Sequence, residues 1–151
     1  MIRNLINADM IASMKSGDKQ TLSCLRMISS KITEEDKKLG NQIDDSAVIG
    51  VILKGIAQRK GSIEAYEKSS SQIGKELASK EQFEIEVLSK YLPKKMSISE
   101  LEEKINQVYS EISNSLPLQA KRGKVLGLLN AKYKGLFEVE DAKLLIDKIV
   151  L

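Results

Sequence analysis

The stretch Leu92-Pro93-Lys94-Lys95-Met96-Ser97 divides this chain of 151 residues. Proline pushes the residue before it out of the helical region of backbone conformation, and it offers no N–H to continue a helix. The polar residues that follow are typical of a linker. We therefore predict a boundary here, with one lobe over residues 1–93 and a smaller lobe over residues 94–151.

Four helices are predicted before this boundary, because apolar residues recur there every three or four positions. Ser16-Gly17-Asp18 ends the first helix and caps the second, and Gly40-Asn41 ends the second. The third opens at Asp44, Asp45 or Ser46. The fourth covers about residues 73–92, and we expect it to point these side chains inward: Leu77, Ile85, Leu88 and Tyr91.

Three shorter helices are predicted after the boundary. A capping box at Ser99-Glu100-Leu101-Glu102 opens the fifth, which closes at Ser113-Asn114-Ser115. The sixth covers residues 121–133 before Gly135, and the seventh starts near Glu140. The sequence therefore predicts an all-α fold, in which a proline hinge joins a four-helix N-terminal lobe to a small C-terminal three-helix bundle.

Composition favours a cytoplasmic protein with a packed core. Hydrophobic residues make up 42% of the chain and charged residues 30%, so enough apolar surface exists to bury. No run of eighteen apolar residues occurs, and the N-terminal segment lacks the apolar centre of a signal peptide. We therefore expect no membrane association.

The sequence contains few candidate catalytic residues. Histidine is absent, which removes the commonest general base and metal ligand, and Cys24 is the single cysteine. Cys24 stands beside Leu25 in an amphipathic helix, where we expect it to act as a small buried hydrophobic residue. We predict no catalytic residue, no metal and no cofactor, and hence a protein that is not an enzyme.

Two groups of charged residues stand out from the mixed pattern elsewhere. Residues 117–135 contain only basic charges, which suits contacts to phosphate groups, although an ordinary solvated face explains the pattern equally well. These basic residues are Lys121, Arg122, Lys124, Lys132 and Lys134. The second group is Gln58-Arg59-Lys60, which precedes Tyr66 on the predicted third helix.

An ordered series of short segments along nearly the whole chain resembles the GatB/YqeY family. The segments are Leu22-Ser23, Leu25-Arg26-Met27-Ile28, Gln58-Arg59-Lys60-Gly61-Ser62-Ile63, Tyr66-Glu67-Lys68, Glu84-Ile85-Glu86-Val87-Leu88, Tyr91-Leu92-Pro93-Lys94, Gly123-Lys124-Val125 and Lys134-Gly135. One departure follows Gly135, where many members have a polar turn with Asp-Gly and this chain has Leu136-Phe137-Glu138-Val139.

The resemblance implies a helical protein similar to the tail domain of GatB. GatB is a subunit of the tRNA-dependent amidotransferase, a carbon–nitrogen ligase that uses glutamine as amido donor, and its catalytic portions have no counterpart here. The tail is thought to grip the outer corner of tRNA. That role falls on Gly123, Lys124, Lys132 and Lys134, to which charge adds Lys121 and Arg122.

Two functional hypotheses follow. The first is a non-catalytic accessory protein that binds tRNA or another folded RNA and works with a tRNA-charging or amidating enzyme. The second is a protein-interaction module, which docks on a translation-related enzyme through the N-terminal lobe. The residues expected to make that contact are Gln58, Arg59, Lys60 and Tyr66.

Overall fold

A computed structural model describes the backbone of residues 1–112 and 114–150, and the side chains of all of these except Val150. Within this described part the chain forms seven α-helices and no strand, which confirms the all-α prediction. Contacts group the chain into two compact units, Met1–Leu92 and Pro93–Leu151, which we call the N-terminal and C-terminal units.

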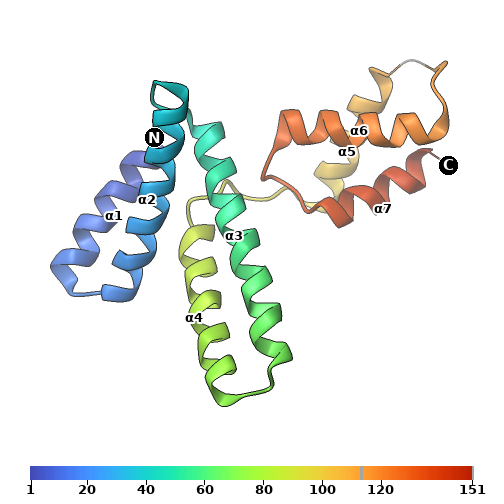
Figure 1. The fold of residues 1–151 in the computed structure, drawn as a ribbon. Helices are drawn as coiled ribbons and strands as arrows, with labels where there is room; N and C mark the ends of the chain where they lie inside the picture. Colours follow the sequence, from blue (N-terminus) through green and yellow to red (C-terminus); the bar gives the residue numbers. More distant parts are fainter. Residues whose placement is uncertain (113, 151) are drawn as a thin grey trace. The chain divides into compact units, whose positions relative to one another are not determined.

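The N-terminal unit consists of two helical hairpins, shown in Figure 1. The first joins α1 (Ile2–Ser16) to α2 (Lys19–Leu39), and the second joins α3 (Asp45–Lys68) to α4 (Gln72–Ser89). Gly17 ends α1 with a left-handed backbone at φ 76°, a conformation that glycine adopts without strain. Because the carboxylate of Asp18 then accepts the Thr21 N–H at 3.1 Å, α2 can begin two residues later.

Aliphatic side chains dominate the core of this unit. Its buried members are Ile6, Cys24, Leu25, Ile28, Ile32, Val48, Ile52, Ile56, Ile85, Val87, Leu88 and Tyr91. The hydroxyl of Tyr91 donates a hydrogen bond to Asp9, which ties the end of α4 to α1. Burial, and then this bond to a carboxylate, raises the pKa of Tyr91.

The prediction for Leu77 is wrong, because this side chain is 40% exposed. Apart from Gly74, every buried residue of α4 lies in the C-terminal half of the helix. Figure 1 shows that the α3–α4 hairpin extends beyond the turn between α1 and α2. The N-terminal half of α4, which contains Leu77, therefore packs against fewer helices than its C-terminal half, although the spacing of Leu77 to Ile85 and Leu88 fits a buried face.

The C-terminal unit packs α5 (Ile98–Ser110), α6 (Leu118–Tyr133) and α7 (Val139–Val150) around a second apolar core. Its buried members are Leu101, Ile105, Val108, Ile112, Val125, Leu129, Phe137, Ala142, Leu145 and Ile146. Phe137 packs in this core, and the carbonyl of Leu136 before it accepts the Met96 N–H at 2.6 Å. The apolar residues after Gly135 thus hold the turn between α6 and α7 against the start of the unit.

The capping box of α5 was predicted two residues too late. Ser97, not Ser99, is the N-cap: its hydroxyl accepts the Glu100 N–H at 3.2 Å, and the Glu100 carboxylate accepts the Ser97 N–H at 2.8 Å. Each serine has a glutamate three residues later, Glu100 after Ser97 and Glu102 after Ser99, so the capping-box spacing fits both and the sequence alone does not separate them. The predicted end of this helix includes Ser113, which lies outside the described residues.

The aliphatic core predicts a clear contrast between two leucines of α2. Leu25→Ala should lower the free energy of unfolding by about 2–5 kcal/mol, because Leu25 is fully buried and its loss leaves a cavity. Leu39→Ala makes the same substitution in the same helix at a side chain that is 63% exposed, and should change it by less than about 0.5 kcal/mol. Urea denaturation followed by circular dichroism measures both, and equal losses would contradict this description of the core.

Candidate nucleic-acid interface

Helix α6 carries the basic window in an orientation that exposes its glycines. Val125 and Leu129 are buried in the C-terminal core. Gly123 and Gly127 lie on the opposite side of the helix, because residues three and four apart share a face. Both glycines are exposed, and a Cβ built on either would meet no other heavy atom within 4 Å. The helix backbone is therefore open to close approach at this face.

Three of the predicted basic residues are already engaged within the C-terminal unit. The Lys132 ammonium lies 2.8 and 3.0 Å from the two carboxylate oxygens of Glu111, and this bond raises the pKa of Lys132. Arg122 Nε lies 3.2 Å from a carboxylate oxygen of Asp147. Lys121 Nζ stands 5.8 Å from the centroid of the Tyr109 ring, within range of a cation–π contact.

Lys124 and Lys134 differ from these three. Both side chains are exposed, and neither forms an ion pair with any other residue in the described part of the chain. Lys124 flanks the open glycine face, one residue after Gly123. Of the five basic residues in this window, Lys124 and Lys134 are thus the two whose charges are not already engaged by other described residues.

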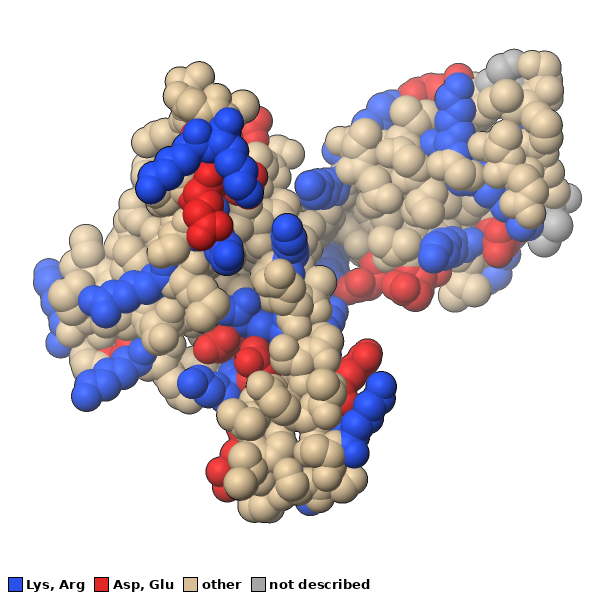
Figure 2. Space-filling view, viewed as in Figure 1, with Lys and Arg blue, Asp and Glu red and all other residues tan. Residues whose placement is uncertain are grey.

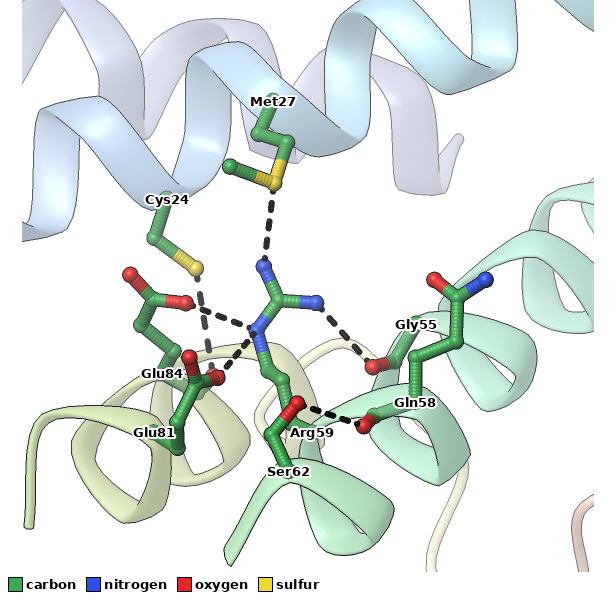
Figure 3. Close-up of polar contacts among 8 residues, drawn as sticks. All are labelled: Cys24, Met27, Gly55, Gln58, Arg59, Ser62, Glu81 and Glu84. Atoms are coloured by element: carbon green, nitrogen blue, oxygen red, sulfur yellow. Dashed lines mark hydrogen bonds and ion pairs between the residues drawn. The ribbon is translucent and has the colours of Figure 1, made fainter. Parts of the chain in front are cut away.

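Arg59, the centre of the second predicted group, is buried. Its residue exposure is 7%, whereas Gln58 and Lys60 are exposed and Tyr66 is half-buried. Figure 3 shows the guanidinium pointing inward between α2, α3 and α4. The predicted docking group therefore does not form one surface patch, since its only arginine faces the core.

The guanidinium of Arg59 bonds to all three surrounding helices, as Figure 3 shows. Its Nε lies 2.8 Å from a carboxylate oxygen of Glu84 on α4 and 4.0 Å from one of Glu81. One terminal nitrogen donates to the Gly55 carbonyl of α3 at 3.0 Å, and the other lies 3.4 Å from the Met27 sulfur of α2. A Cβ at Gly55 would stand 3.4 Å from that guanidinium, so the glycine keeps space for it.

Cys24 adjoins this cluster and is inert. It has no exposed surface, and its thiol lies 3.8 Å from the Glu84 carbonyl oxygen. Burial raises the pKa of the Cys24 thiol to about 11, so the reactive thiolate is scarce at neutral pH. The prediction that Cys24 acts as a small buried hydrophobic residue is confirmed.

Two features of this geometry were missed at the level of sequence. Gly127 completes the open face of α6, and its signal was the four-residue spacing from Gly123. The Arg59–Glu84 pair spans two helices and 25 residues, and a mixed charge pattern gives no local sign of such a pair.

No group of three or more His, Cys, Asp or Glu side chains in the described part of the chain is placed to hold a metal ion. No described helix is both long and apolar enough to cross a membrane.

The fold and the site define a class: a helical protein of two compact units, with an acid-free basic helix in the second. The model of the Yqey-like protein family matches residues 3–150, so this chain belongs to that family. It is also similar to an uncharacterized protein of Schizosaccharomyces pombe, with 31% identity over 96 residues. The match covers 64% of this chain and 76% of the yeast protein.

The burial of Arg59 predicts that its loss destabilises the fold far more than the loss of its exposed neighbour Lys60. Arg59→Ala should lower the free energy of unfolding by about 3–5 kcal/mol, because Glu84 is then left partly buried without its cation. Lys60→Ala, the exposed neighbour, should change it by less than about 0.5 kcal/mol. If Arg59→Ala unfolds in urea at the same midpoint as the wild type, Arg59 does not hold the three helices together.

Proposed function

We propose that this protein is a non-catalytic accessory protein that binds tRNA or another folded RNA through the exposed face of α6. The observation that carries the proposal is the open glycine face of an acid-free helix, flanked by the uncompensated Lys124. A phosphate backbone requires close approach and positive charge, and this face offers both.

The placement of the aromatic side chains supports recognition of phosphates and shape. None of the six is exposed: Tyr91 and Phe137 are buried, and the other four are half-buried. Proteins that read single-stranded bases stack them on exposed aromatic rings. With no such ring available, contacts to the backbone of a folded RNA fit this surface better than readout of unpaired bases.

The paired cations suit a secondary role in the same contact. Lys132 and Arg122 hold exposed or half-exposed carboxylates, and such surface ion pairs are worth at most about 1 kcal/mol each. A phosphate group can therefore compete with Glu111 or Asp147 for these cations at low cost. Lys124 and Lys134 make the primary contacts in this proposal.

The competing hypothesis of a protein-docking module rests on a smaller exposed surface than the sequence predicted. Arg59 is occupied in the core, so only Gln58, Lys60 and part of Tyr66 remain accessible in the predicted docking group. RNA binding is the function that the geometry supports better. Partnership with a tRNA-charging or amidating enzyme is part of the proposal and follows from the family resemblance.

Reversing the two uncompensated charges tests the site. The double variant Lys124→Glu/Lys134→Glu should weaken binding to total tRNA by at least about tenfold at low salt, because two phosphate contacts become repulsions. Lys124→Arg/Lys134→Arg keeps both charges and should bind as the wild type does. Fluorescence anisotropy with labelled tRNA measures these affinities.

A matched control separates the effect of the α6 site from the effect of net charge. Lys143→Glu/Lys148→Glu reverses two exposed lysines of α7 in the same unit and should reduce the affinity much less. Equal losses in the α6 and α7 variants would show that only net charge matters. Undiminished binding in the α6 variant would remove α6 as the contact surface.

A further inference from the structure

A second face without acidic side chains runs along α2. Its members recur with the helical period over residues 19–37, a length of about 27 Å, and each is exposed. They are Lys19, Ser23, Arg26, Ser30, Thr33 and Lys37, and we call this surface the α2 outer face. The buried residues of α2 lie on the other side of the helix, against the N-terminal core.

The cations of the α2 outer face are uncompensated. Lys19, Arg26 and Lys37 form no ion pair with any described residue, whereas their neighbours Lys31 and Lys38 pair with Glu34 and Glu35. Figure 2 shows mostly Lys and Arg side chains, with little acidic surface, around the end of the unit where α1 meets α2.

Two acidic residues adjoin this face, Asp18 at its start and Glu34 beside Thr33, and both have other partners. Glu34 pairs with Lys31. Asp18 precedes Lys19 directly, and its carboxylate accepts the Thr21 N–H as the cap of α2. A hydrogen bond with the Thr21 side chain, and then the one from its backbone N–H, lower the pKa of Asp18, which favours the ionised carboxylate at the helix end. Asp18 is therefore held at the cap instead of reaching along the face to neutralise Arg26.

A surface hollow of about 450 Å³ lies on the same face, lined by Lys19, Leu22, Ser23 and Arg26. Lys19 and Arg26 are seven residues apart, which is two helical turns or about 10.5 Å, and the Ser23 hydroxyl lies between them. The hollow therefore lies between the positions of two cations on the α2 outer face.

We propose that the α2 outer face is a second phosphate-contact surface for the RNA that α6 binds. This inference rests on the proposed function and extends it from the C-terminal to the N-terminal unit. Three unpaired cations spread over about 27 Å match a ligand with repeated negative charge, such as a nucleic-acid backbone. A single small anion would need only the hollow and would leave Lys37 without a role.

The test uses the full chain and labelled total tRNA, titrated at several salt concentrations. Lys19→Gln/Arg26→Gln should bind about tenfold more weakly at low salt, and the slope of log K against log salt should fall by about two. The matched control is Lys60→Gln/Lys75→Gln, which removes two exposed lysines from α3 and α4 in the same unit. The control should keep the slope of the wild type.

Comparison with the α6 variant separates the two proposals. If Lys124→Glu/Lys134→Glu weakens binding and the α2 variant behaves like its control, the α2 surface is excluded and α6 stands alone. If only the α2 variant weakens binding, RNA binding belongs to the N-terminal unit and the α6 assignment fails. If the wild type binds no tRNA at low salt, both proposals are overturned.

Discussion

A guanidinium buried among apolar side chains must be neutralised in place, and this requirement joins three helices of the N-terminal unit. Arg59 meets it through Glu84 on α4, the Gly55 carbonyl on α3 and the Met27 sulfur on α2. The Gly55 contact lies within α3, whereas the contacts with Glu84 and Met27 cross to α4 and α2, so these two depend on how the three helices are placed. Gly55 contributes by leaving space for the guanidinium.

The same cluster takes one arginine away from the surface of the protein. Uncompensated basic side chains lie elsewhere, at Lys124 and Lys134 in the C-terminal unit and on the α2 outer face. The open glycine face of α6 and the α2 outer face each lie opposite the buried stripe of their own helix, so each unit presents its face to solvent without disturbing its core. In the proposed function, packing and RNA binding use different sides of one helix.

Local signals in the sequence predicted the helices well. Gly17 and Gly40 end α1 and α2, and Asp18 caps α2, as predicted. Features that depend on contacts between distant residues could not be predicted from such signals. Leu77 fits an inward stripe, yet its side chain is 40% exposed. In the same way, the charges of Lys132 and Arg122 were visible, but their partners Glu111 and Asp147 belong to other parts of the fold.

The central claim is that this protein binds a folded RNA through its phosphates. Measuring the affinity of the wild-type protein for total tRNA over a range of salt concentrations tests it most directly. We expect log K to fall linearly with log salt, with a slope that reports several released counterions. Affinity that does not change with salt, or no binding at the lowest salt, would contradict the claim.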